Sequence, residues 1–141
     1  MEKLNSSVDF CLNIAKFQTE LNRRLDSRLG GIGFNEFIIL NHLDQADGQK
    51  MRRVDLAEKV GLTASGVTRL LLPMEKIGLI KRIADENDAR VSYAAIASGG
   101  KTKLSEGLER IEIFCEDLIP KNKIKKVEEF SALLIELGKN I

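Results

Sequence analysis

The segment Leu62–Gly78 has the pattern of an amphipathic helix whose outer face is unusual in composition. Its apolar residues recur at i, i+3, i+4 and i+7, which predicts one buried stripe made of Val67, Leu70, Leu71 and Met74. The opposite face carries small or hydroxylated residues and one cation, namely Ala64, Ser65, Thr68 and Arg69. A core helix would share the stripe, but its solvent face usually mixes both signs of charge, and no acid occurs here before Glu75. Small side chains, hydroxyls and an arginine are typical of a helix that enters the DNA major groove.

The flanking residues place this helix in a helix-turn-helix. Val54–Val60 has the pattern of a short helix, and Gly61 follows it directly. Thr63 is predicted to cap the second helix, because its hydroxyl can accept from an amide of the first turn. Two short helices joined by a turn that contains glycine are typical of the helix-turn-helix. Gly78 stands where a glycine commonly ends a helix.

Two β-prone runs follow the helix-turn-helix. Leu79–Ile83 and Arg90–Ile96 are separated by the polar turn Asp85–Asp88, which predicts a β-hairpin. Gln49–Met51 can add a short third strand. A helix-turn-helix followed by a hairpin is a winged helix, so the sequence predicts a mainly α fold with a small β-hairpin wing.

Four motifs, in this order and spacing, resemble the MarR family of transcription factors: Phe34–Leu40, Ser65–Leu70, Glu75–Arg82 and Asp88–Arg90. The resemblance implies that residues 34–99 form a winged helix-turn-helix DNA-binding lobe within a single MarR-type chain. Residues 1–30 and 100–141 would then be dimerisation helices. The family likeness also implies a repressor that binds a palindromic operator as a homodimer and responds to a small aromatic or phenolic ligand.

Eight residues are predicted to take part in DNA binding. The recognition helix and its cap contribute Thr63, Ser65, Thr68 and Arg69. The first strand of the wing carries two cations suited to phosphate, Lys81 and Arg82. The resemblance further implies that Arg90 lies at the wing tip and reaches the minor groove, with Asp88 orienting its guanidinium. The alternative for this last pair is an ordinary exposed ion pair of little consequence.

Positive charge is concentrated on the predicted DNA-binding segment. Residues 50–82 hold eight lysines and arginines against three acidic residues, a net charge of +5. The remaining residues carry −4, which leaves the whole chain of 141 residues at +1. The low total charge therefore hides a basic region where phosphates would bind.

Both ends of the chain are predicted to form long helices with more apolar surface than the winged lobe can cover. Residues 4–29 carry two apolar stripes, one of Phe10, Ile14, Phe17, Leu21 and Leu25 and the other of Leu4, Val8, Cys11 and Ala15. A later helix runs to about Ile119, where Pro120 ends it. The last helix repeats apolar residues at alternating spacings of three and four: Val127, Phe130, Leu134, Leu137 and Ile141. A dimer would bury the excess.

Three details of the connections are also predicted. Gly30–Gly33 is a linker rather than a phosphate-binding loop, because no strand precedes it and no Gly-Lys-Ser/Thr follows. Asn35 is expected to cap the next helix. Ala97 stands where the family has a capping threonine, so Ser98 is the expected substitute cap of the helix after the wing.

The sequence offers no group of residues suited to catalysis, a metal or a cofactor. Cys11 and Cys115 are far apart in sequence, and His42 is the single histidine, which we interpret as structural. A redox-sensing regulator that uses Cys11 is the first alternative, but peroxide-sensing relatives activate such a cysteine with tyrosines. The single tyrosine here is Tyr93, in the wing, and Cys11 shares an apolar stripe with Val8 and Ala15, so we expect Cys11 to be buried and inert.

A second alternative is a winged-helix protein-interaction module that does not bind DNA. The basic segment and Arg90 argue against it. No apolar run reaches membrane-spanning length, and the polar residues 1–7 do not resemble a signal peptide, so we expect a cytoplasmic protein without membrane contact.

Overall fold

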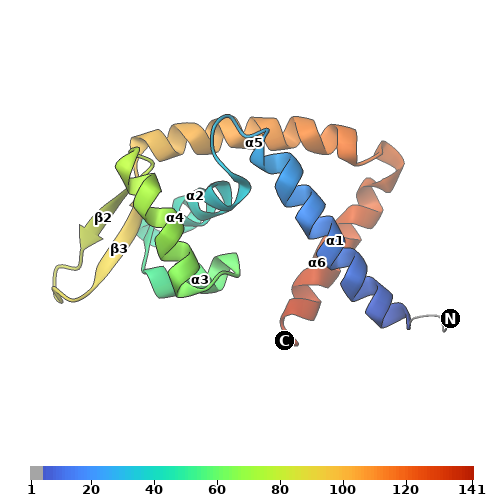
Figure 1. Cartoon of the computed structure of the whole chain (residues 1–141), viewed down its shortest axis with the longest axis horizontal. Helices are drawn as coiled ribbons and strands as arrows, with labels where there is room; N and C mark the ends of the chain where they lie inside the picture. The colour runs from blue at the N-terminus through green and yellow to red at the C-terminus, as the bar shows by residue number, and fades with distance from the viewer. Residues whose placement is uncertain (1–4) are drawn as a thin grey trace.

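The computed structural model describes residues 5–141, and within them six α-helices and one three-stranded antiparallel sheet. In chain order the elements are α1 (Ser6–Asp26), α2 (Phe34–Gln45), β1 (Lys50–Met51), α3 (Arg53–Val60), α4 (Ala64–Lys76), β2 (Ile80–Ala84), β3 (Ser92–Ile96), α5 (Ser98–Leu118) and α6 (Ile124–Gly138). Helix α5 spans the molecule as a bar, with the winged lobe at its N-terminal end and α1 and α6 at the other (Figure 1). The predicted mainly α fold with a β wing is confirmed.

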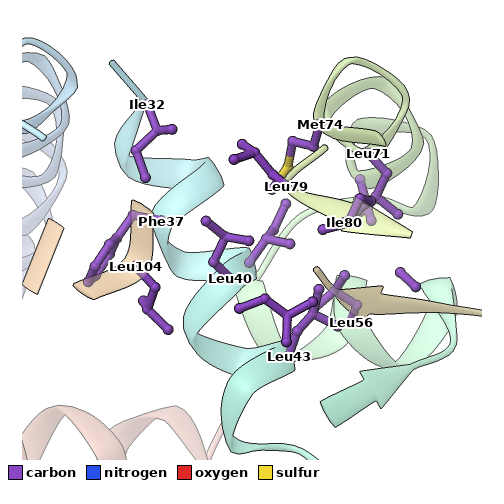
Figure 2. Close-up of a cluster of buried hydrophobic side chains, with 14 of the residues drawn as sticks. Ile32, Phe37, Leu40, Leu43, Leu56, Leu71, Met74, Leu79, Ile80 and Leu104 are labelled. Atoms are coloured by element: carbon purple, nitrogen blue, oxygen red, sulfur yellow. The ribbon is translucent and has the colours of Figure 1, made fainter. Parts of the chain in front are cut away.

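The hydrophobic core lies inside the winged lobe, with α2 at its centre. Leu40 and Leu43 of α2 are fully buried against Leu56 of α3 and Met74 of α4, and Leu104 of α5 closes the other side (Figure 2). Each such side chain contributes about 1.5–3 kcal/mol when fully buried. This core holds α3 and α4 in one orientation, and therefore fixes the helix-turn-helix.

The sheet has the order β1-β3-β2, with both pairs antiparallel. Ile80 pairs with Ile96 and Ala84 with Ser92, so the hairpin is in register along its whole length. The predicted third strand is confirmed, because Lys50 pairs with Ala95 on the other edge of β3.

The two ends of α1 differ from the prediction for different reasons. Asn5 caps the helix, accepting from the amide of Ser7 at 2.7 Å, while Leu4 lies outside the described residues. The helix ends at Asp26 rather than Leu29, and the chain turns before the linker. Leu29 is nevertheless fully buried, since the turn packs it into the core.

The predicted caps of α2 and α5 are both wrong. Helix α2 begins at Phe34, so Asn35 is already helical, and the Phe34 amide donates to Asp26 Oδ1 of the preceding segment at 2.8 Å. Helix α5 begins at Ser98, with Ala97 in the cap position and no side-chain cap hydrogen bond. The Ala97 amide instead donates to the Leu79 carbonyl at 3.0 Å, so packing against the start of the wing fixes this helix end.

Close packing ties α5 to the winged lobe. A Cβ on Gly100 would collide with the Leu79 carbonyl oxygen, and one on Gly107 would lie 2.8 Å from Cδ2 of Phe37. The glycines let α5 approach the backbone after α4 and the aromatic ring of α2 more closely than any other residue would allow. Helix α5 is therefore held rigidly against the DNA-binding lobe.

Candidate nucleic-acid interface

Helix α4 has a defined start and a defined end. Thr63 Oγ1 accepts from the Gly66 amide at 3.0 Å, which confirms the predicted N-cap. At the other end Gly78 has φ of 81°, and the Leu79 amide donates to the Met74 carbonyl at 2.9 Å. The Gly78 amide donates to the Glu75 carbonyl at 3.1 Å. These two hydrogen bonds form a Schellman motif, which favours glycine at the left-handed position.

The two faces of α4 separate as the sequence predicts. Val67, Leu71 and Met74 are buried in the core. Ser65 and Arg69 are exposed, and Arg69 forms no ion pair with any described residue. The Ser65 hydroxyl lies 3.2 Å from Thr63 Oγ1, so it belongs to the capping turn while still facing solvent.

Thr68 differs from its neighbours because its hydroxyl is already engaged. It donates to the Ala64 carbonyl at 3.0 Å and accepts from Arg53 Nη1 at 3.2 Å. Arg53 is the first residue of α3, and sequence reasoning did not select it. No local pattern joins two residues fifteen positions apart, so only the packing of α3 on α4 reveals this contact.

The cations of the wing lie beside α4. Lys81 and Arg82 are exposed on β2, and Arg82 forms an ion pair with Glu75 of α4 at 3.5 Å. A shallow cleft of about 30 Å³ separates helix and wing, and its lining includes Arg53, Thr68, Leu72, Lys81 and Arg82. The cleft thus brings together cations from two elements, α3 and β2.

The turn of the wing holds Arg90 on Asp88. Oδ1 of Asp88 accepts from the Arg90 amide at 3.0 Å and from its Nε at 3.2 Å, and Oδ2 accepts from Nη2 at 3.4 Å. The guanidinium and then the backbone amide of Arg90 lower the pKa of the Asp88 carboxyl. The Arg90 side chain is still 90% exposed, so its guanidinium is oriented without being covered. This is the arrangement that the sequence predicts for the pair.

A second notable feature is an apolar groove of about 730 Å³ between α1, α5 and α6. Its lining is rich in aromatic and aliphatic side chains, among them Phe10, Phe17, Phe34, Phe114, Phe130 and Leu134. The Phe10 and Phe130 rings meet edge to face at 6.2 Å between centroids. No residue of α6 is buried, although the helix is strongly apolar. The groove therefore leaves much apolar surface uncovered.

The cysteines and the histidine lie outside the basic surface. Cys11 is exposed on α1, so the prediction of a buried thiol is wrong for the single chain; the first turns of α1 project away from the core (Figure 1). Cys115 is half-buried, and burial raises the pKa of its thiol. Partial burial and then nearby Lys59 lower the pKa of His42, which favours a neutral, structural histidine. Among residues 5–141 no group of three or more possible ligands could hold a metal ion.

The lobe is a winged helix-turn-helix, and the outer face of α4 exposes Ser65 and Arg69. Residues 34–92 of the 141-residue chain match the model of the MarR family, so the winged lobe is similar to that family. In the described part of the chain, no helix is long and apolar enough to cross a membrane. None of the curated proteins compared matches this chain.

Solved structures with the same fold cover 97–100% of the chain. The transcriptional regulator BldR from Sulfolobus solfataricus is 24% identical, with 100% of both chains covered and a TM-score of 0.86. PcaV from Streptomyces coelicolor, in complex with its natural ligand, is 15% identical, covers 99% of this chain and 98% of its own, and has a TM-score of 0.82. A mutant of MarR from E. coli, complexed with operator DNA, is 18% identical over 97% and 99%, with a TM-score of 0.81. At these identities the likeness shows the fold.

Proposed function

We propose that this protein is a homodimeric, ligand-responsive repressor that binds a palindromic operator. The observation that carries the proposal is the outer face of α4, which exposes Ser65 and Arg69 without a neighbouring carboxylate and is flanked by the cations of the wing. A helix with this surface fits the major groove, where an arginine can donate two hydrogen bonds to guanine. We place the DNA-binding lobe at residues 34–99.

Each part of the basic surface has a separate role in this proposal. Arg69, Ser65 and Thr68 face base edges, and the Thr63 cap sets the start of the helix. Lys81 and Arg82 bind phosphates next to the groove. Arg90, preoriented by Asp88, reaches the minor groove or its backbone from the wing tip. Preorientation favours binding because little side-chain freedom is left to lose.

Residues 1–30 and 100–141 are proposed to form the dimer interface. Support comes from the uncovered apolar groove and from exposed apolar residues that occur along all three helices, such as Leu12, Ile113 and Leu133. A monomeric soluble protein seldom leaves apolar patches of this extent. Two-fold symmetry would then present two α4 helices to successive major grooves.

A small aromatic ligand is proposed to bind where the groove approaches the winged lobe. Phe34 at the start of α2 and Phe114 of α5 both line the groove, so a ligand there would touch the lobe and the dimer helices together. Arg28 lies over the Phe114 ring at 5.4 Å from its centroid and adds a cation to this end. A ligand that favours one spacing of the two lobes would alter DNA affinity.

The proposal is tested by operator selection followed by titration of two arginine variants. DNA selected from a random pool is titrated against a scrambled sequence at several salt concentrations. Arg69→Ala should relax the preference at one position in each half-site, at a cost of about 1–3 kcal/mol for the lost base contact. Arg90→Ala should weaken binding to all sequences and lower the salt slope by about one per half-site.

Asp85→Ala is the matched control, because it changes the same turn without touching a predicted contact. If Arg90→Ala binds both DNAs as tightly as the parent, the wing makes no contact and that part of the proposal fails. If the parent binds selected and scrambled DNA equally at every salt concentration, the protein is not a sequence-specific regulator. The protein-interaction module would then be the better account.

A redox-sensing regulator is the second candidate, because Cys11 is exposed in the single chain. We expect Cys11→Ser to leave DNA binding and its response to ligand intact, since Tyr93 of β3 belongs to the wing and not to α1. The measurement is DNA release on addition of peroxide, with Cys115→Ser as the control thiol. Peroxide-dependent release in the parent that is lost only in Cys11→Ser would establish the redox mechanism instead.

We further propose that the protein has no enzymatic role and works in the cytoplasm.

A further inference from the structure

We propose that the Ala64 carbonyl and Arg53 together engage the Thr68 hydroxyl, so that Thr68 recognises thymine through its methyl group while Arg53 binds the phosphate backbone. The inference rests on the proposed DNA binding and adds two things to it. It assigns a contact to Arg53, which no sequence pattern selects, and it names the base that Thr68 prefers.

The hydrogen bonds of Thr68 leave its hydroxyl little capacity for a base. A hydroxyl has one hydrogen to donate and two lone pairs to accept with. The hydrogen goes to the Ala64 carbonyl at 3.0 Å, and one lone pair accepts from Arg53 Nη1 at 3.2 Å. The hydroxyl therefore cannot donate to guanine or to thymine O4, which are the acceptors that a groove-facing threonine would otherwise read.

The methyl group is the part of Thr68 that remains for recognition. It is attached to the same Cβ as the engaged hydroxyl and, being apolar, takes no part in either hydrogen bond. Leu72, one helical turn further along, is 48% exposed and lines the same cleft, so the outer face of α4 continues as an apolar surface. In the major groove the one apolar group that a base pair offers is the thymine methyl.

Arg53 has donors left after it binds Thr68. A guanidinium carries five N–H donors, and no described carboxylate lies within ion-pair distance of it. Glu75, the one acid that lines the same cleft, is paired with Arg82. The cleft thus has an excess of positive charge, which comes from Arg53, Lys81 and Arg82. The anion that DNA offers beside the groove is a phosphate.

The experiment uses the full-length protein and its selected operator, in which each thymine is replaced in turn by uracil. Uracil pairs with adenine as thymine does and differs from thymine by the missing methyl alone. The parent should lose about fourfold in affinity at one thymine per half-site, the effect of one buried methyl. Thr68→Val, which keeps the methyl, should retain this loss, whereas Thr68→Ser, which keeps the hydroxyl, should bind both DNAs alike.

Two variants of Arg53 test its own contact. Arg53→Gln removes the charge but keeps an amide that can donate to Thr68, so we expect a salt slope lower by about one per half-site with the thymine preference intact. Arg53→Ala should lower the slope equally and also leave the thymine preference intact, because the Thr68 hydroxyl still donates to the Ala64 carbonyl. Circular dichroism melts verify that each variant is folded.

The outcomes separate this inference from the proposed function. Discrimination that survives in Thr68→Ser would show that a group other than the Thr68 methyl contacts the thymine methyl, and would overturn the inference while DNA binding stands. An unchanged salt slope in Arg53→Gln would overturn the phosphate contact. Absence of any specific binding by the parent would remove the proposed function and this inference with it.

Discussion

Replacing Leu134 and Leu137 together with glutamate is expected to give a monomer that no longer binds operator tightly. Both residues lie on α6, where they are 39% and 37% exposed, and Leu134 lines the apolar groove. A charge in the centre of a desolvated interface would be buried without a partner, which costs several kcal/mol per group. Loss of the second half-site should lower operator affinity by about a hundredfold or more, because the two lobes then bind independently.

Analytical ultracentrifugation and an operator titration are the measurements. Lys126→Glu is the control, since it introduces the same charged side chain on α6 at a residue that does not line the groove. The control should sediment and bind as the parent does. Unchanged sedimentation of the double glutamate variant would refute an interface built on α6.

Gly100→Ala should destabilise the protein more than any other single methyl added at a glycine of α5. The new Cβ would meet the Leu79 carbonyl oxygen as well as Ile96 and Leu40 side-chain atoms, and backbone cannot move aside as a side chain can. Overpacking of this kind costs about 3 kcal/mol, which should lower Tm by about 10 °C. Differential scanning calorimetry measures the change.

Alanine variants of two further glycines serve as comparisons for Gly100→Ala. Gly107→Ala meets the Phe37 ring at 2.8 Å, and because a ring can shift, the loss should be smaller. Gly138→Ala, at the end of α6, meets nothing within 4 Å, and alanine is the better helix former, so Tm should stay or rise slightly. Equal Tm values for the Gly100 and Gly138 variants would contradict the tight docking of α5 on the lobe.

Local patterns predicted the features that depend on neighbouring residues. The Thr63 cap and the left-handed Gly78 each involve residues at most three apart, so composition and spacing are sufficient to find them. The Asp88–Arg90 contact is equally local, and the resemblance to the MarR family implied it. The apolar stripe of α4 and the presence of the hairpin follow from helix and strand patterns in the same way. The winged helix could therefore be predicted from the sequence.

Contacts between elements could not be predicted in this way. Asp26 takes the role expected of Asn35, because the linker returns the chain so that a carboxylate from α1 reaches the Phe34 amide. Arg53 reaches Thr68 only because α3 packs across α4. The exposure of Cys11 depends on how far α1 extends beyond the lobe, which a stripe of apolar residues does not reveal.

Hydroxyl-radical footprinting of the protein on its selected operator tests the central claim most directly. Two symmetric lobes that each insert α4 into a major groove should protect two patches of equal extent, with centres about 10 base pairs apart and related by a two-fold axis. The sequences under the two patches should be inverted repeats. A single protected patch would contradict a dimer that reads a palindrome through two copies of α4. Protection of the same extent on unrelated DNA sequences would contradict it as well.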